Sequence, residues 1–398
     1  MSRPLRIAVI APLRYPISQP HAGGLESSVW NQVRTLRSRG HRVVLCATEG
    51  SDFLDGGPAE FTLPRPVWDD ESLATDTTYP DGYLDRAFAA LDRAMEYLRD
   101  HADDFDVVDN HCLHGLPLGW ADRLGIPMVS TLHTPTLPAL LEAHASCGEP
   151  RSRFLAVSRH TAREWAVEGI ETTVVPNGID TDRWMLGPGG PDLVWFGRIV
   201  PEKGAHLAIR AARLAGRRLV LAGRIGDADY FEREVAPFLG NGVEYVGPLG
   251  QADLAELVGR SACALVTPVW EEPFGLVIAE ALATGTPVAA FDTGGVAEVA
   301  GSSTGARLVA MGDVEALARA ATALAEGAAH DRHLRAAIRD GVVERFSLEA
   351  RAATLEGIYS ALADGFAGEG ASPAADARHH AGLAPGLAPD LAPETVGA

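Results

Sequence analysis

The sequence predicts an α/β protein made of two doubly wound domains that face each other across a cleft. Short apolar stretches alternate with helical patterns along the chain, which is typical of parallel sheets with helices on both faces. A stretch rich in Gly and Pro, 181–191, interrupts this alternation near the middle, and the alternation then begins again. At 398 residues the chain is long enough for two domains of ordinary size. We therefore expect two Rossmann-like domains.

The N-terminal domain is expected to span residues 1–182. Its first strand is predicted at Leu5–Ala11, and Gly23-Gly24 precedes a helix that runs to Leu36 and is stopped by Gly40 at a cap position. The other elements predicted in this half are the helix Tyr83–His101 and the strands Arg42–Ala47, Phe105–Asp109, Pro127–Leu132, Phe154–Val157 and Thr172–Val175.

The C-terminal domain is expected to span residues 192–345, after an interdomain linker at 183–191. Its strands are predicted at Leu193–Phe196, Leu219–Ala222, Val243–Val246, Ala262–Val266 and Pro287–Phe291, and helical patterns follow at 313–326, 331–344 and 347–363. Residues 367–398 consist mainly of Ala, Gly and Pro in an irregular repeat. Such a composition cannot bury a core, so we expect a disordered tail.

Composition narrows the class of protein. A net charge of −19 argues against nucleic acid and anionic membranes as partners. No stretch is long and apolar enough for a membrane-spanning helix, and the short run Ile7–Leu13 lacks a signal-peptide cleavage site. The four cysteines are scattered without a C-x-x-C pair, which favours reduced thiols over a zinc site or disulfides. We expect a cytoplasmic protein.

One lysine stands out in an arginine-rich chain. Lys203 is the single lysine among 34 basic Lys and Arg residues. It follows Arg198 by five positions, between two glycines and just after an apolar strand. A forked guanidinium and a compact ammonium at that spacing could together hold a phosphate or a pyrophosphate. The alternative is that Lys203 lies on a solvated turn without a function.

The densest pattern lies between Glu271 and Val288, directly after a predicted strand. Gly275 is expected to open a helix whose first amides suit a phosphate or the polar rim of a sugar. Glu272 and Glu280 would be roughly 12 Å apart along a continuous helix, more than the carboxyl pair of a glycoside hydrolase requires. This spacing favours two separate roles on one long ligand, although Glu280 as a plain solvated residue stays open. Neither domain carries G-x-G-x-x-G after a strand, so a dinucleotide-dependent oxidoreductase fits poorly.

Four segments, in order along the chain, resemble the motifs of retaining glycosyltransferases of the GT-B fold, family 4. They are Gly23-Gly24-Leu25-Glu26, Thr131-Leu132-His133-Thr134, Gly197-Arg198 with Lys203-Gly204, and Glu272-Pro273-Phe274-Gly275 with Glu280, which is the family's E-x7-E motif. The resemblance spans about residues 5–365. Each motif alone is weak, but four in order are specific for the family and much less so for the substrate.

The resemblance implies a role for each matching residue. Arg198 and Lys203 would hold the diphosphate of the donor, and Glu280 would accept hydrogen bonds from the ribose hydroxyls. The transferred sugar would be bound by Glu272 and by the backbone amides of Phe274, Gly275 and Leu276.

On the N-terminal side, the resemblance places His133 beside the sugar near the reaction centre. Whether His133 would act as a base or as a hydrogen-bonding group stays open. Gly23 and Gly24 would let the backbone approach the phosphate or the sugar. The family's last helix crosses back to the N-terminal domain, a role that falls to residues 346–366.

Four other clusters are interpreted as structural. Asp180-Thr-Asp182 and Asp227-Ala-Asp229 have the Asp-x-Asp form of a metal site but are common by chance in an acidic chain. His111 and His114 flank Cys112 at a spacing that fits no common zinc pattern, although either could still reach the cleft. The run Asp69-Asp70-Glu71 would suit a cationic acceptor, but charge runs are more often solvated surface. We expect no metal and no cofactor.

The expected activity is transfer of a hexose or N-acetylhexosamine, with retention, from a nucleotide diphosphate sugar to a small soluble acceptor that is not identified. A UDP-sugar is the expected donor, and a homodimer stays open. Alternatives on the same fold are a nucleotide-sugar epimerase, a sugar-phosphate synthase and a non-catalytic nucleotide-sugar-binding protein. A dehydrogenase is the least favoured reading.

Overall fold

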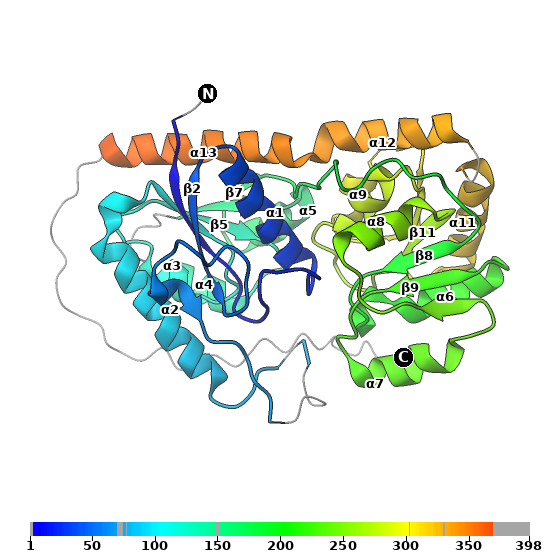
Figure 1. Cartoon of the computed structure of the whole chain (residues 1–398), viewed down its shortest axis with the longest axis horizontal. Helices are drawn as coiled ribbons and strands as arrows, with labels where there is room; N and C mark the ends of the chain where they lie inside the picture. Colours follow the sequence, from blue (N-terminus) through cyan, green and yellow to red (C-terminus); the bar gives the residue numbers. More distant parts are fainter. Residues whose placement is uncertain are drawn as a thin grey trace.

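The computed structural model describes residues 3–69, 75–76, 78–147, 152–301, 303–328 and 331–368. The chain forms two α/β domains, the first in blue and cyan and the second in green and yellow, with two helices lying end to end across both (Figure 1). Asp70, Glu71 and the expected disordered tail from residue 369 onward lie outside the described residues.

The described part of the N-terminal domain contains a seven-stranded parallel sheet in the order β3-β2-β1-β4-β5-β6-β7. Its strands are β1 Arg6–Ile10, β2 Arg42–Thr48, β3 Thr62–Leu63, β4 Val107–Asn110, β5 Met128–Leu132, β6 Ser152–Ala156 and β7 Thr172–Val174. Its helices are α1 Gly24–Ser38, α2 Tyr83–Asp100, α3 Leu116–Trp120, α4 Pro138–Ser146 and α5 Arg159–Val167.

Both faces of this sheet are covered because alternate residues of each strand point to opposite sides. Ala8 and Ile10 of β1 belong to a core shared with α2, α3 and α4. Ile7 and Val9 belong to a second core, which contains α1 and also residues of the last helix of the chain. The N-terminal sheet is therefore closed on one face by the C-terminal end of the fold.

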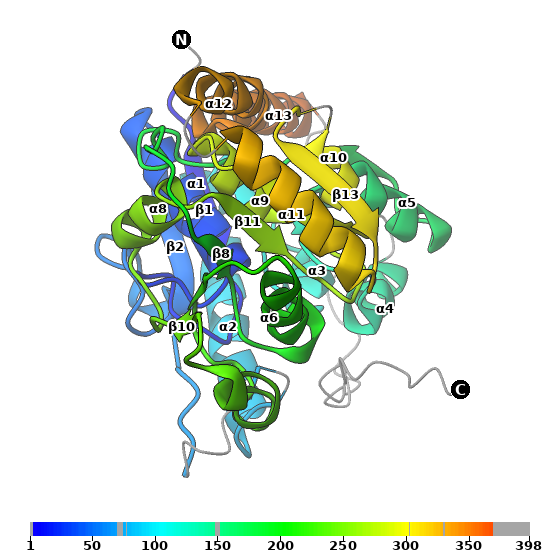
Figure 2. The same cartoon turned by 90° about the vertical axis from the view of Figure 1, so that its right-hand side faces the viewer.

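The described part of the C-terminal domain contains a six-stranded parallel sheet in the order β10-β9-β8-β11-β12-β13. Its strands are β8 Leu193–Phe196, β9 Leu219–Ala222, β10 Val243–Tyr245, β11 Cys263–Val266, β12 Val288–Asp292 and β13 Ala306–Ala310. Its helices are α6 Ala205–Leu214, α7 Ala228–Tyr230, α8 Gln251–Gly259, α9 Leu276–Ala283, α10 Val296–Ala300, α11 Val314–Ala328 and α12 Arg332–Phe346. Helices α6 and α11 pack on one face of the sheet, and α8, α9, α10 and α12 on the other (Figure 2).

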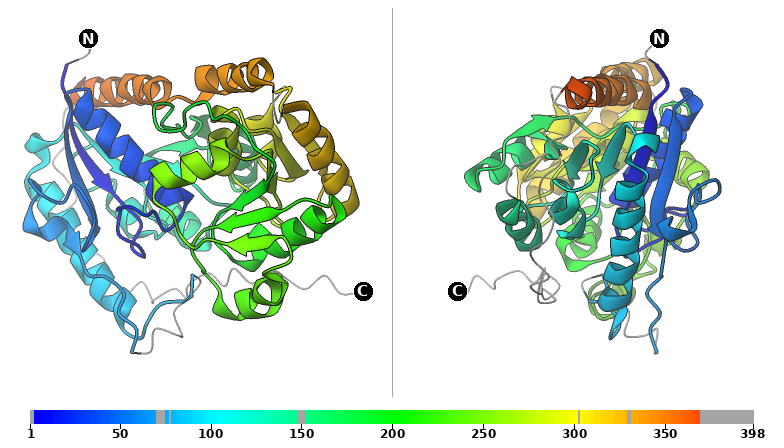
Figure 3. Two further views of the ribbon diagram at one scale, coloured as in Figure 1. Left: turned by 45° about the vertical axis from the view of Figure 1, so that its right-hand side comes forward. Right: turned by 90° about the vertical axis from the view of Figure 1, so that its left-hand side faces the viewer.

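The chain passes between the domains twice, and the two passages lie side by side. Ile179 leaves the first domain, and its amide donates to the carbonyl oxygen of Phe346 at 2.7 Å. Leu348 opens the final helix α13 (Leu348–Gly368) and donates back to the Ile179 carbonyl at 3.1 Å. Helix α13 then packs on α1 and β4 of the N-terminal domain, in line with α12 (Figure 3). One narrow crossing therefore joins the two domains.

Other contacts join the domains directly. Gln251 at the start of α8 donates to the Ser27 hydroxyl of α1 at 3.1 Å. The Glu298 carboxylate of α10 accepts from the backbone amides of Arg159 and His160 at the start of α5, at 2.8 and 2.6 Å. A carboxylate at a helix N-terminus is favoured by the helix dipole. These contacts hold the carboxyl ends of the two sheets face to face.

The fold class expected from the sequence is confirmed, and the differences are local. The segments β3, α3, α4 and β13 were not predicted, because they are short and their apolar residues do not repeat with a clear period. Trp184, within the expected linker, is 1 % exposed and packs into the core of the C-terminal domain. Among the described residues, no helix is both long enough and apolar enough to cross a membrane.

Candidate active site

Lys203 lies in a short 3₁₀ turn, Pro201–Lys203, in the loop that follows β8. Its Nζ atom is 2.5 Å from Oε2 of Glu272, which lies in the loop after β11. The same Oε2 accepts a hydrogen bond from the indole of Trp270 at 3.0 Å, and Nζ lies 4.7 Å from the centre of that ring. The predicted phosphate-binding lysine and the predicted sugar-binding glutamate are thus direct neighbours.

Arg198, also in the loop after β8, is paired with a residue that the sequence analysis missed. Its Nη1 atom lies 2.7 Å from the Asp76 carboxylate, which comes from the N-terminal domain. Arg224, after β9, contacts the same carboxylate at 2.8 Å, and the Tyr15 hydroxyl donates to it. Burial alone would raise the pKa of Asp76, but Arg224 and Arg198 outweigh it and lower that pKa. Asp76 is therefore an anion held between two guanidinium groups.

The loop that carries Glu272 is held by hydrogen bonds from the segment after β12, which contains the glycine pair Gly294-Gly295. Gly295 donates from its amide to the Glu272 carbonyl oxygen at 2.6 Å, and Thr293 donates to the Trp270 carbonyl at 2.8 Å. A Cβ atom on Gly294 would lie 2.3 Å from the Glu272 carbonyl oxygen, and the φ angle of Gly294 is +57°. Glycine is the residue that tolerates both constraints. The pair was not predicted, because a Gly-Gly step after a strand is common in turns.

Gly275 adopts φ +87° and caps α9, so the chain turns sharply between Glu272 and the helix. Glu272 is therefore not part of the helix, whereas Glu280 lies in its second turn. Phe274 is 4 % exposed and packs edge-on against Phe346, which anchors the loop in the core. The first amides of α9 have no partner inside the helix and can bind an anion or a sugar hydroxyl.

Glu280 is half-buried, and burial raises the pKa of its carboxyl to about 8. No hydrogen bond to this side chain is seen within the described ranges of the chain. A carboxyl group in this state is a protonated, unpartnered polar group, and a ligand that donates hydrogen bonds would stabilise its ionised form. This environment suits a carboxyl group that forms hydrogen bonds with the hydroxyls of a ligand, which is the role that the resemblance implies for Glu280.

The glycine pair of the N-terminal domain lies against the C-terminal site. A Cβ atom on Gly23 would lie 3.6 Å from Cδ of Arg198, and one on Gly24 would lie 3.2 Å from a methyl group of Leu276. Glu26, one turn into α1, is 7 % exposed, and burial raises the pKa of its carboxyl. The structure thus brings Gly23 and Gly24 to the residues predicted to bind the donor.

His133 follows β5 directly, and its ring Nε2 lies 2.8 Å from Nδ1 of His111. Burial, His111 and Arg351 together hold the pKa of His133 well below its usual range, so this ring is neutral. His111, which we interpreted as structural, therefore contacts a predicted site residue. Neither the side chain of His133 nor that of Glu280 is hydrogen-bonded to another predicted site residue within the described part of the chain.

The two Asp-x-Asp segments make other contacts. Asp180 accepts from Arg34 at 2.6 Å, and Asp227 caps α7 by accepting from the Tyr230 amide at 2.8 Å. The described residues contain no cluster of three or more His, Cys, Asp or Glu side chains placed to hold a metal ion.

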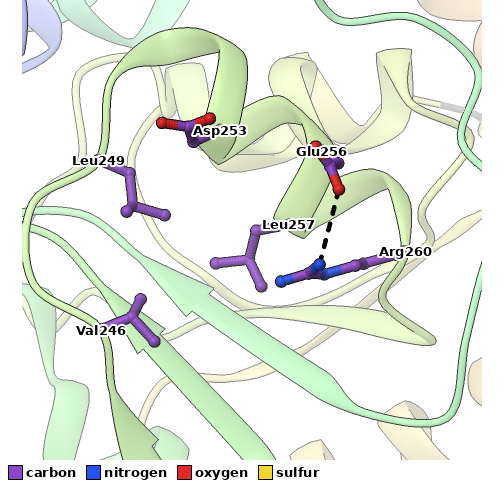
Figure 4. A pocket seen from close by; sticks show the side chains of 6 residues that line it. All are labelled: Val246, Leu249, Asp253, Glu256, Leu257 and Arg260. Carbon is purple, nitrogen blue, oxygen red and sulfur yellow. Dashed lines mark ion pairs between the residues drawn. The ribbon is translucent and has the colours of Figure 1, made fainter.

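A surface pocket of about 250 Å³ lies between α8 and the strand-end residues Val246 and Leu249 (Figure 4). Its polar lining comes from Asp253, Glu256 and Arg260, and the last two form an ion pair at 3.6 Å. None of the predicted site residues lines it. This pocket is separate from the candidate active site.

Solved structures show that the arrangement of the two domains belongs to a known class. Sucrose-phosphate synthase from Thermosynechococcus elongatus superposes with a TM-score of 0.69 at 21% identity, covering 91% of this chain and 100% of that one. Anabaena Alr3699/HepE, crystallised in complex with UDP-glucose, superposes with a TM-score of 0.68 at 20% identity, covering 90% and 100%. The fold is that of the GT-B glycosyltransferases.

The sequence comparisons agree and narrow the class. Residues 22–183 match the model of Glycosyltransferase Family 4, and residues 181–340 match that of Glycosyl transferases group 1. A phosphatidyl-myo-inositol mannosyltransferase of Mycobacterium leprae is 30% identical over 353 residues, covering 80% of this chain and 87% of that protein. A D-inositol 3-phosphate glycosyltransferase of Gordonia bronchialis is 30% identical over 357 residues, covering 76% and 77%. The chain is a glycosyltransferase and belongs to glycosyltransferase family 4.

Proposed function

We propose that the protein transfers a hexose or N-acetylhexosamine, with retention of anomeric configuration, from a UDP-sugar to a small polar acceptor. The observation that supports this most directly is the pairing of Lys203 with Glu272 in the loop before α9, together with the position of Arg198 against Gly23 and of Leu276, the first residue of α9, against Gly24. Two cations and free amides around one glycine pair suit a diphosphate leaving group, which gains negative charge as the anomeric bond breaks. The glycine pair Gly23-Gly24 approaches these groups from the other domain.

The donor and acceptor classes are supported by the relatives. Anabaena Alr3699/HepE was crystallised with UDP-glucose, and the two relatives named above act on inositol compounds by their names. A polyhydroxylated ring such as an inositol or its phosphate is therefore the first acceptor class to test. Retention is carried over from the family resemblance.

We further propose that the reaction needs no metal ion. Arg198 and Lys203 supply the positive charge that a divalent ion would bring to the diphosphate. The Asp-x-Asp carboxylates cap a helix or pair with Arg34. Full activity after EDTA treatment is expected, and a requirement for added Mn²⁺ or Mg²⁺ would overturn this part of the proposal.

A thermal-shift panel of UDP-, GDP-, ADP- and dTDP-sugars tests donor choice, because a ligand of the folded state raises the melting temperature. The selected donor is then incubated with inositols and inositol phosphates, and the product is analysed by NMR for its anomeric configuration. An α-linked product from an α-linked donor supports the proposal. Inversion would refute retention, and an epimerised nucleotide sugar formed without acceptor would indicate an epimerase.

A further inference from the structure

His133 is the last member of a buried chain of hydrogen bonds formed by residues of helices α1 and α13 and by residues at the ends of strands β4 and β5. Asp109 of β4 lies 3.0 Å from Nε2 of His111, and the other ring nitrogen of His111 reaches His133. Asp109 and His111 are fully buried. A chain of this kind transmits the orientation of each group to the next.

The other end of this chain of hydrogen bonds is formed by residues of helices α1 and α13. Arg351 of α13 donates through Nε and Nη2 to Oε1 of Gln32 at 3.3 and 3.1 Å. Because a guanidinium has only donors, the amide oxygen of Gln32 must face Arg351, and its NH₂ group then donates to Asp109. Gln32 is 4 % exposed, so water does not offer it an alternative partner.

These contacts determine which nitrogens carry protons. Nε2 of His111 lies 3.0 Å from Oδ2 of Asp109 and 3.1 Å from the amide nitrogen of Gln32, which itself donates to the same Oδ2. We place the hydrogen of His111 on Nε2, because a bare Nε2 would turn its lone pair toward the carboxylate oxygen. In a neutral His111, Nδ1 then has only a lone pair and must accept from Nε2–H of His133. It follows that Nδ1 of His133 is unprotonated.

Charge balance favours the neutral state of the His133 ring. The titratable groups that face the pair are Asp109 from β4 and Arg351 and Tyr359 from α13. Asp109 and Arg351 carry opposite charges, and burial, followed by Asp109, raises the pKa of Tyr359 so that its hydroxyl stays neutral. A further proton on the His133 ring would leave a buried charge without a counter-ion, which is costly.

We propose that His111 is a positioning residue that holds His133 in the tautomer with a free Nδ1, so that His133 accepts a hydrogen bond from a hydroxyl group of the bound sugar or acceptor. This inference rests on the proposed function for the identity of its ligand. The His133 ring is half-buried, and within the described ranges Nδ1 has no hydrogen-bond partner in the protein. Without His111, the ring could rotate or change tautomer and present a donor at the same place.

The tautomer can be measured in the whole, unmodified protein. Long-range ¹H–¹⁵N correlation spectra of histidine-labelled protein distinguish Nε2–H from Nδ1–H, and the His133→Gln variant assigns the signal. We expect the neutral Nε2–H form of His133 between about pH 6 and pH 8. An Nδ1–H form or a doubly protonated ring would overturn the proposal, whether or not any sugar donor is turned over.

Kinetics test the consequence for turnover. His111→Phe keeps an aromatic ring and should lower kcat by about tenfold or more, while the Kd for UDP changes by less than about twofold. The matched control is His114→Phe on the same loop, since the half-buried His114 packs against Phe88 and Tyr79 and is not part of the chain. An unchanged kcat in His111→Phe, or an equal loss in His114→Phe, would refute a positioning role. Absence of turnover in the wild-type protein with every donor would instead refute the proposed function.

Discussion

The two sides of the candidate active site are built differently. On the C-terminal side, charged groups lie on short loops after β8 and β11 and form ion pairs, as Lys203 does with Glu272. On the N-terminal side, His133 ends a buried chain of hydrogen bonds whose members come from β4, α1 and α13. The cations of the ion pairs can exchange their carboxylate partners for a charged ligand. The hydrogen-bonded residues around His133 are buried and keep their relative positions.

This difference indicates that the two sides of the candidate active site have different roles. Lys203 and Arg198 are each satisfied by a carboxylate, on Glu272 and Asp76, whose side chains are 13 % and 6 % exposed. A diphosphate can take the place of these carboxylates, and Asp76 then keeps Arg224 as its partner. In the His133 chain, loss of one member would leave a buried partner unsatisfied. We therefore expect substitutions on the donor side to affect ligand binding, and substitutions in the histidine chain to affect turnover and stability.

The largest effect is expected on the donor side. Lys203→Ala should lower kcat/KM for the nucleotide sugar by about 100-fold, since a charge-assisted contact to phosphate contributes about 3 kcal/mol. Lys203→Arg should recover only part of this loss, because a planar fork does not replace a point charge. The control is Arg210→Ala, which removes one positive charge from an exposed position of α6. Steady-state kinetics would contradict the assignment if Lys203→Ala and Arg210→Ala behaved alike.

The loop that carries Glu272 should depend on the glycine after β12. Gly294→Ala should destabilise the fold by about 2 kcal/mol and lower activity about tenfold, because the added Cβ meets the Glu272 backbone and the φ angle is positive. In the matched control Gly341→Ala, the new methyl group has open space in α12, and stability should rise by about 0.5–1 kcal/mol. Urea unfolding curves measure both. Equal stabilities of the two variants would show that the loop adapts.

Glu280 should make stability depend on pH in a defined direction. Its pKa is raised to about 8 in the folded protein, so between the unfolded pKa of 4.5 and about pH 8 the folded state holds a proton that the unfolded state has lost. Stability from this group therefore falls as the pH rises through that window. Glu280→Gln removes the dependence, so its melting temperature should exceed that of the wild type by a few degrees at pH 8.5 and match it near pH 4.5. A difference that is constant with pH would contradict the burial of this carboxyl.

The smallest effect is expected for the ion pair that joins the two sides. Asp76 holds Arg198 and Arg224 in the absence of ligand, so Asp76→Ala should free these cations and tighten UDP binding by about three- to tenfold. Asp81→Ala, at an exposed position close in sequence, makes the same change in net charge without such a pair and should leave the Kd nearly unchanged. Isothermal titration calorimetry measures both. Weaker UDP binding in Asp76→Ala would mean that Asp76 orders the site instead of competing for it.

The sequence by itself determined the fold class and predicted most of the residues of the candidate donor side. The β/α alternation predicted both sheets, because apolar period and turn residues are local properties. Arg198, Lys203, Glu272 and Glu280 were predicted because each pair lies within one loop or loop–helix segment, at a spacing that the sequence shows directly.

Only the tertiary structure decided which residues surround these groups. Asp76 meets Arg198 across 122 positions, and Gln32 meets Arg351 across 319, and no local pattern encodes such a contact. His111 was interpreted as structural because its spacing to Cys112 and His114 fits no metal site; its link to His133 depends on β4 and β5 being neighbours in the sheet. In a parallel sheet the functional residues lie at the carboxyl ends of the strands. Which of these residues become neighbours depends on the strand order and on helix packing, and the spacing of residues along the chain does not reveal either.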